Sequence, residues 1–245
     1  MNKILLYEEL SLNAHPALQT QLYDGWVLRF ANGYTKRANS INPLYSSSLD
    51  LHVKITYCEE MYQKHGLPVV FKLTDDSDPQ IDKMLDERAY EVVEPTYVMS
   101  MDINDRDYHT KGAIITDHAD EKWLDAYYTF GKYSDSLRMA TAKQILDSVK
   151  NQMLCGLIIK DGKAVACVSA VIEREHMALL NVVVDESWRG KGYGMEICEA
   201  LLAEAKQVGA KTAYLQVVQA NHVALSLYKK LGYQVAYSYW YRVKY

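Results

Sequence analysis

Residues 182–208, VVVDESWRGKGYGMEICEALLAEAKQV, decide the fold of this 245-residue chain. The run of three valines is β-branched and predicts the end of a buried strand. The segment RGKGYG follows, with glycines at positions 190, 192 and 194. Behind it, apolar residues recur at the spacing of one helix face: Ile197, Leu201, Ala205 and Val208. The stretch therefore predicts a strand, a glycine-rich turn and a helix.

A strand, a glycine-rich turn and a helix together make a geometry that binds anions. Glycine lets the backbone come close to a ligand, and the first amides of a helix have no partner within it and lie at its positive end. Arg189 and Lys191 add full positive charges. We therefore predict that a pyrophosphate binds to Arg189, Gly190, Lys191, Gly192, Tyr193 and Gly194. The alternative is a plain turn that needs glycine only for its backbone angles.

Two other phosphate-binding motifs do not fit the turn. The pattern GxxxxGK[ST] of P-loop proteins does not occur in the chain. The dinucleotide-binding pattern is GxGxxG, whereas the glycines here have the order GxGxG and follow an arginine.

The pattern Arg189-x-x-Gly192-x-Gly194 resembles the acetyl-CoA pyrophosphate loop of the GCN5-related N-acetyltransferases (GNAT superfamily). A second block, NHVALSLYKKLGY at residues 221–233, is similar to another conserved segment of that family. The resemblance covers about residues 114–245, a little over half of the chain. It implies an α/β fold with a mixed, mostly antiparallel central sheet flanked by helices, and it implies acetyl-CoA as co-substrate.

The composition of the chain limits the binding partners, the cellular compartment and the metal sites that we expect. The net charge of −4 gives no reason to expect nucleic acid or an anionic membrane as a partner. No apolar run approaches 18 residues and no signal peptide is evident, so we predict a cytoplasmic protein. The four cysteines have no CxxC spacing and the seven histidines form no HExxH pattern, so we predict no metal site.

The first half of the chain repeats the order of elements in the second half at an offset of 143 residues. Gly66 then corresponds to Gly209, and the predicted strand 69–73 corresponds to a strand near 212–217. We infer two tandem GNAT-like domains, a degenerate one at residues 1–105 and a catalytic one at 106–245, joined by the polar residues 108–112. A coincidence in the order of elements is the alternative.

The repeat fails at the anion-binding turn. Residues 46–50, SSSLD, take the place of the glycine-rich loop but contain no glycine, no cation and one carboxylate. We therefore predict that the first half holds no second acetyl-CoA, and that it is structural or forms one wall of the acceptor cleft.

Residues 26–40, WVLRFANGYTKRANS, resemble an N-terminal block of some bacterial two-domain acetyltransferases. The block carries four polar residues that could bind an acidic acceptor: Arg29, Lys36, Arg37 and Asn39. We interpret them instead as a solvated polar face.

The family resemblance supplies a mechanism. It implies that the strand ending at Val184 diverges from the strand 212–218 and that the thioester arm lies between them, held by the backbone of Val182, Val183 and Val184. Backbone donors near the developing oxyanion lower the barrier, and proximity favours direct attack by the amine. Asn221 is expected to cap its helix or to contact the cofactor arm.

Tyr228 stands at the position of the tyrosine that protonates the thiolate in this family. A phenol with a pKa of about 10 would give its proton to a thiolate whose acid has a pKa of about 8.5, at a cost of roughly 2 kcal/mol. A hydrogen bond can offset that cost. The alternative is that Tyr228 belongs to the apolar stripe formed with Ala224, Leu227 and Leu231.

No general base is evident. Many relatives carry a glutamate where this chain has Asn181, and an amide does not usefully accept a proton at neutral pH. Glu173 and His176 lie nearby in the sequence and could act through water, or the amine could arrive already neutral. Four residues could line the acceptor pocket or simply pack: Tyr127, Tyr128, Tyr133 and Arg138.

These observations favour an N-acetyltransferase that moves acetyl from acetyl-CoA to a primary amine by direct attack. The main alternative is a non-catalytic acyl-CoA-binding sensor or interaction module, and an acyl group larger than acetyl stays open. Residues 237–245 alternate like an edge strand that could pair between subunits, so a homodimer also stays open.

Overall fold

The computed structural model describes residues 2–104, 106–108 and 112–245. It divides into two compact units. The N-terminal unit comprises Met1–Tyr97, Val218–Ala220 and Ala236–Tyr245, and the C-terminal unit comprises Val98–Val217 and Asn221–Val235. Residue 105, the last of the predicted first domain, and residues 109–111 of the predicted linker lie outside the described residues. The boundary between residues 105 and 106 stays a prediction.

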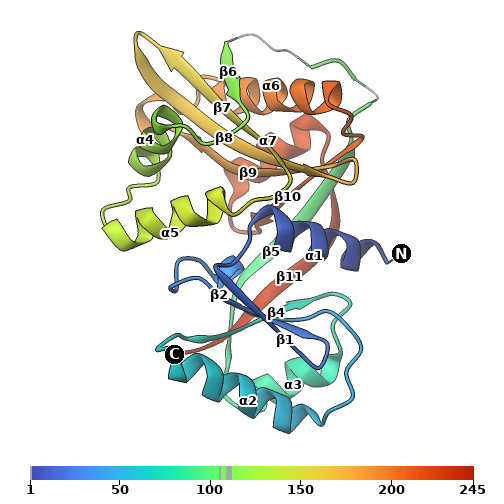
Figure 1. Ribbon diagram of the computed structural model, residues 1–245. Helices are drawn as coiled ribbons and strands as arrows, with labels where there is room; N and C mark the ends of the chain where they lie inside the picture. Colours follow the sequence, from blue (N-terminus) through green and yellow to red (C-terminus); the bar gives the residue numbers. More distant parts are fainter. Residues whose placement is uncertain (1, 105, 109–111) are drawn as a thin grey trace. The chain divides into compact units, whose positions relative to one another are not determined.

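The N-terminal unit is a sheet with helices beside it (Figure 1). Its elements are α1 (Lys3–Ala14), β1 (Gln19–Tyr23), β2 (Trp26–Phe30), β3 (Ile41–Pro43), α2 (Leu51–Lys64), β4 (Val69–Thr74), α3 (Pro79–Glu87), part of β5 (Glu91–Asp102) and most of β11 (Gln234–Lys244). The strand order is β1-β2-β3-β4-β11-β5. β3 runs parallel to β4, whereas β1/β2, β2/β3 and β4/β11 are antiparallel.

The core of the N-terminal unit lies between this sheet and α2 and α3. Every residue of β2, WVLRF, is buried. The Trp26 ring meets the Phe71 ring edge to face at 5.7 Å, and Ile55 of α2 and Leu85 of α3 are fully buried in the same cluster. Four of the five residues of β2 are apolar, and the buried Arg29 is the exception.

β11 is an interior strand, so the prediction of an edge strand at residues 237–245 is wrong. It pairs with β4 in the register Arg242↔Phe71 and stands between β4 and β5 in the strand order. Arg242 is bound by Asp82 of α3 at 2.9 Å and by Asp86 at 2.8 Å. The alternation of this segment therefore reflects a strand with one face against α3.

The polar block of residues 26–40 is also built differently from its prediction. Arg29 is only 3% exposed, and its guanidinium donates hydrogen bonds to the backbone carbonyls of Leu12, His15 and Arg37. The buried Asn39 amide oxygen accepts from the N–H of Ala31 at 2.7 Å. The interpretation as a solvated face is wrong for Arg29 and Asn39, because both tie backbone segments together inside the unit.

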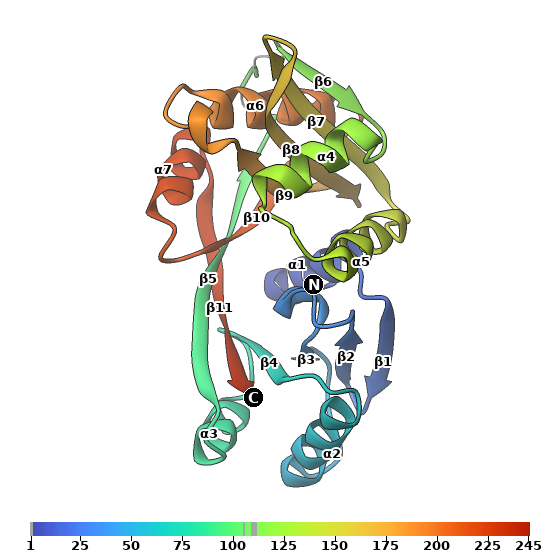
Figure 2. The same ribbon diagram turned by 90° about the vertical axis from the view of Figure 1, so that its left-hand side faces the viewer.

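The C-terminal unit contains the longer strands. Its elements are β6 (Ala113–Thr116), α4 (Glu121–Phe130), α5 (Ser136–Asp147), β7 (Gln152–Lys160), β8 (Lys163–Glu173), β9 (His176–Val184), α6 (Tyr193–Gln207), β10 (Thr212–Val218) and α7 (His222–Leu231). The strand order is β10-β9-β8-β7-β6, with β9/β10 parallel and the other pairs antiparallel. α4 and α6 cover opposite faces of this sheet (Figure 2). The fold is thus α/β, with a mixed sheet flanked by helices.

The two halves match closely at the offset of 143 residues. Adding 143 to the bounds of β4 gives 212–217, against Thr212–Val218 for β10, and adding it to those of α3 gives 222–230, against His222–Leu231 for α7. Each unit also contains a parallel pair, β3/β4 and β9/β10, although adding 143 to the bounds of β3 gives 184–186, which meets β9 only at Val184. This correspondence supports the tandem arrangement.

In the described part of the chain, no helix combines the length and the apolar character that a membrane span requires.

Candidate active site

The parallel strands β9 and β10 diverge after a short paired stretch. Their registered pairs run from Thr212↔His176 to Tyr214↔Ala178. Residues 182–184, further along β9, therefore have no registered partner on β10. This divergence agrees with what the family resemblance implies.

A pocket of about 900 Å³ lies within the C-terminal unit beside the diverging strand. It is formed by the end of β9, the loop that follows it and the first turns of α6 and α7. It brings together ten of the predicted site residues: Val182, Val183, Val184, Arg189, Gly190, Gly192, Tyr193, Gly194, Asn221 and Tyr228. Lys191 does not line it. The Lys191 ammonium instead lies over the Trp188 ring, 4.4 Å from its centroid.

The N–H groups of residues 190–194 differ from that of Arg189, which donates to the Glu186 carbonyl at 3.4 Å. Gly190 and Gly192 have φ of +76° and +90°, angles that favour glycine. The Gly192 carbonyl already accepts from Met195 and Glu196, at 3.0 and 3.1 Å. Within residues 2–104, 106–108 and 112–245, no acceptor is found for the N–H groups of residues 190–194. These groups, at the start of α6, can therefore bind an anion.

Arg189 is anchored near the loop by its own neighbours. Its Nε donates to the Val184 carbonyl at 3.2 Å, and its guanidinium lies 3.7 Å from Glu186. The side chain stays 59% exposed, so its charge is available to a ligand in the pocket.

Tyr228 reaches the pocket from α7. Burial, with a smaller contribution from Cys198, raises the pKa of Tyr228 and keeps the phenol protonated. Among the described residues its hydroxyl has no hydrogen-bonding partner, while its ring meets that of Tyr233 at 5.9 Å. The raised pKa makes full proton transfer to a thiolate more costly, but the hydroxyl can still donate a hydrogen bond to a ligand.

Asn221 is the N-cap of α7, since its amide oxygen accepts from the Ala224 N–H at 3.1 Å. Three residues of the same helix line the pocket without having been expected from the sequence: His222, Ser226 and Lys230. Their spacing of four places them on one helix face, which is the signal that could have found them.

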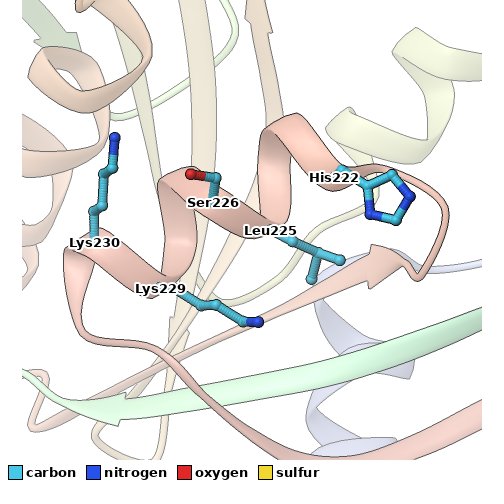
Figure 3. Close-up of a pocket in the computed structure, with 5 residues that line it drawn as sticks. All are labelled: His222, Leu225, Ser226, Lys229 and Lys230. Carbon is cyan, nitrogen blue, oxygen red and sulfur yellow. The ribbon is translucent and has the colours of Figure 1, made fainter.

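A smaller hollow of about 500 Å³ lies on α7 itself. Figure 3 shows Lys229 and Lys230 pointing to different sides of the helix, with His222 at its first turn. Lys230 lines both this hollow and the pocket of about 900 Å³, and it adds a positive charge to that pocket.

Glu173 and His176 lie at the turn between β8 and β9, where they form the last registered pair. Val182 lies six positions beyond His176 along the strand, a distance of about 20 Å. Glu173 accepts a hydrogen bond from Asn151 at 2.9 Å, and burial followed by the charge of Arg174 lowers the pKa of His176. The structure therefore does not bring this pair of predicted bases to the pocket.

In the described part of the chain, no group of three or more His, Cys, Asp or Glu residues is arranged to hold a metal ion.

Comparisons with known proteins agree with this geometry. A family described as "Probable histone acetyltransferase Rv0428c C-terminal" matches residues 3–242. The "Uncharacterized N-acetyltransferase YobR" of Bacillus subtilis is 29% identical over 254 residues, with both chains covered completely.

Solved structures also resemble the chain. A GCN5-related N-acetyltransferase from Kribbella flavida has a TM-score of 0.72 at 14% identity, over 100% of this chain and 96% of that one. A tandem GNAT protein from the clavulanic acid biosynthesis pathway has a TM-score of 0.65 at 10% identity, over 89% of this chain and 77% of that one. At these identities the likeness shows the fold alone.

Proposed function

The chain belongs to the family of the Rv0428c C-terminal region, among the GCN5-related N-acetyltransferases, and on this premise we propose that it transfers acetyl from acetyl-CoA to a primary amine. The class of enzyme, an acyltransferase of the N-acetyltransferase type, comes from the family. The donor, the acceptor and the roles of individual residues are the proposal.

One observation carries the proposal: the N–H groups of residues 190–194 have no acceptor in the described part of the chain, and the loop that bears them lines a pocket of about 900 Å³. A pyrophosphate supplies the negative oxygens that such groups bind. Each hydrogen bond to a charged group contributes about 1.5–3 kcal/mol, so three or four of them account for micromolar affinity.

The rest of acetyl-CoA would follow the diverging strand. Its pantetheine arm would lie along Val182–Val184, whose backbone has no registered partner on β10. The thioester would then lie near Tyr228, which lines the same pocket.

In the proposed reaction the amine nitrogen attacks the thioester carbonyl carbon and the C–S bond breaks. The sulfur leaves as a thiolate and is stabilised by the Tyr228 hydroxyl, which donates its hydrogen bond or its proton. The nitrogen loses its extra proton to water, and Tyr228 recovers its own from solvent.

Titration calorimetry with acetyl-CoA tests the proposal. Gly192→Glu places a carboxylate in the loop and should abolish binding. Gly162→Glu is the matched control, because Gly162 also has a positive φ (+76°) and open space around its Cα, but lies in the β7–β8 turn. Equal affinity of the Gly192→Glu variant and the wild type would show that the loop does not bind the pyrophosphate. Binding without turnover on a panel of primary amines would favour the acyl-CoA-binding module instead.

A further inference from the structure

β9 contains a bulge directly before the residues that line the pocket. The register with β8 shifts between Cys167 and Ser169, and Asn181 has φ of +53°. Asn is among the residues that tolerate this conformation, and a bulge re-aims the side chain that it carries. The Asn181 side chain thus points out of the regular alternation of the strand, directly before Val182 of the acetyl-CoA pocket.

The side chain of Asn181 is fixed by two neighbours. Its Nδ2 donates to the Ser169 hydroxyl at 2.9 Å, and its Oδ1 accepts from the Tyr127 hydroxyl at 3.4 Å. The Tyr127 and Tyr133 hydroxyls are 3.0 Å apart. β8, α4 and the segment after α4 therefore hold one amide in one orientation.

This amide still has capacity for a ligand. An amide oxygen accepts two hydrogen bonds, and only the one from Tyr127 is present among the described residues. Asn181 is half-buried, so a small donor can approach it.

Among the described residues, no carboxylate hydrogen-bonds to Asn181. On α4 and the segment after it stand Tyr127, Tyr133 and Tyr128, whose hydroxyl donates to the Met139 carbonyl at 2.9 Å. The Arg138 guanidinium lies 5.8 Å from the Tyr133 ring centroid. Beyond the end of β9, Glu186 is held by Lys132 at 2.8 Å.

We propose that the Asn181 amide oxygen binds and orients the acceptor amine and that the amine reacts in its neutral form, without a protein base. This inference rests on the proposed acetyl transfer. A neutral amine donates one N–H to Oδ1 and keeps its lone pair for the carbonyl carbon. Carbon–nitrogen bond formation, loss of the thiolate and loss of the extra proton to water then complete the transfer.

A protonated amine also binds to Oδ1 but has no lone pair with which to attack. The rate at limiting amine should therefore follow the neutral fraction of the amine itself. For a weakly basic and a strongly basic primary amine, taken from a panel as the best substrates of each kind, kcat/KM should rise tenfold per pH unit up to the pKa of each amine. Inflections at one common pH for both amines would show a protein base and overturn the inference.

Three variants and one control variant separate the role of Asn181 from its packing. Asn181→Ala should raise the KM of the amine about five- to tenfold, the effect of one lost hydrogen bond, and leave the acetyl-CoA Kd unchanged. Asn181→Asp keeps the shape but supplies a carboxylate, and should add an acidic inflection shared by both amines. Tyr127→Phe should raise the amine KM about twofold, whereas Tyr128→Phe, in the same aromatic cluster but bonded to Met139, should not.

The outcomes distinguish this inference from the proposed function. Normal acetyl-CoA binding and turnover with an unchanged amine KM in Asn181→Ala would overturn the inference alone. Failure of the wild type to acetylate any amine of the panel would overturn the acetyl transfer and this inference with it.

Discussion

The loop after β3 and the loop after β9 both lead into a helix, but in the described part of the chain only the first is bound by a carboxylate of the protein itself. In the N-terminal unit the Asp24 carboxylate accepts from the N–H groups of Ser48 and Leu49, at 3.0 and 2.9 Å, and from the hydroxyls of Ser47 and Ser48. Lys54 completes the shell at 3.1 Å. In the C-terminal unit, no such carboxylate is found among the described residues for the N–H groups of residues 190–194.

The difference arises in the turn between β1 and β2. Asp24 and Gly25 both have positive φ, +40° and +80°, and a Cβ at Gly25 would lie 2.3 Å from the Ser46 carbonyl. Because Gly25 has no side chain, the turn packs closely against the Ser46 carbonyl, and the Asp24 carboxylate reaches the N–H groups of Ser48 and Leu49. Hydrogen bonds from Leu49, Ser47 and Ser48 hold the pKa of Asp24 well below its usual range. Backbone donors thus precede a helix in both units: the chain supplies a carboxylate to them in one unit, and in the other it leaves them available to a ligand.

The largest effect should come from giving the second loop an anion. Gly190→Asp places a carboxylate where φ is +76°, an angle that Asp tolerates. It should weaken acetyl-CoA binding about 100-fold or more, since it takes up loop donors and repels the pyrophosphate. Gly190→Asn has the same shape without the charge, so calorimetry should show a clearly smaller loss. Equal losses in both variants would mean that the loop does not bind an anion.

The second prediction concerns the helices that correspond across the units. At the offset of 143, Tyr228 of α7 corresponds to the fully buried Leu85 of α3. If only α7 carries a proton donor, Tyr228→Phe should lower kcat about 10²-fold and leave the acetyl-CoA Kd unchanged. Stopped assays of thiol release and calorimetry measure the two constants. A kcat of Tyr228→Phe equal to that of the wild type would mean that Tyr228 only packs against its apolar neighbours on the helix.

The third prediction removes the internal anion. Asp24→Asn should lower the melting temperature at neutral pH, because the loop donors and Lys54 lose a charged partner. Asp161→Asn is the control: it also stands at positive φ before a glycine, in the β7–β8 turn. A melting temperature of Asp24→Asn equal to that of the control variant would show that Asp24 does not stabilise its loop.

Acid should abolish the same difference. The folded pKa of Asp24 is depressed, so its contribution to stability is present above the unfolded pKa of about 3.9 and is lost as the pH falls toward the folded value. Unfolding of wild type and Asp24→Asn, followed from neutral to acidic pH, should converge below about pH 4. A constant gap through that range would contradict the assignment.

For the last prediction we expect no change: the number of acetyl-CoA molecules bound per chain should be the same in the wild type and in Asp24→Asn. The wild type should bind one acetyl-CoA per chain, and Asp24→Asn should still bind one, because residues 46–50 have no glycine and Asp50 caps α2 with its own carboxylate. The fitted stoichiometry of the titration gives the answer. A second site in either protein would mean that the N-terminal loop also accepts the coenzyme.

The sequence predicts well what depends on local pattern. The glycine-rich loop and the start of α6 follow from local features of the sequence, and the structure has both where we expected them. The lack of glycine in residues 46–50 is a local feature of the same kind. Contacts between distant segments were not visible. Nothing near residues 46–50 points to Asp24, and nothing near Arg29 points to the carbonyls that bind it.

Two misplaced features have simple physical causes. Glu173 and His176 are close to Val182 in the sequence. A strand extends about 3.3 Å per residue, so residues a few positions apart along β9 are far apart in space. An alternating pattern like that of residues 237–245 gives the buried face of a strand but not its partner, so it could not show that β11 pairs with β4.

Backbone amide NMR of the labelled protein, titrated with acetyl-CoA, tests the central comparison most directly. We expect large shifts for the N–H groups of Gly190, Gly192 and Gly194, and none for those of Ser48 and Leu49, which Asp24 already binds. Shifts at Ser48 and Leu49, or unmoved signals at residues 190–194 while the coenzyme binds, would contradict it.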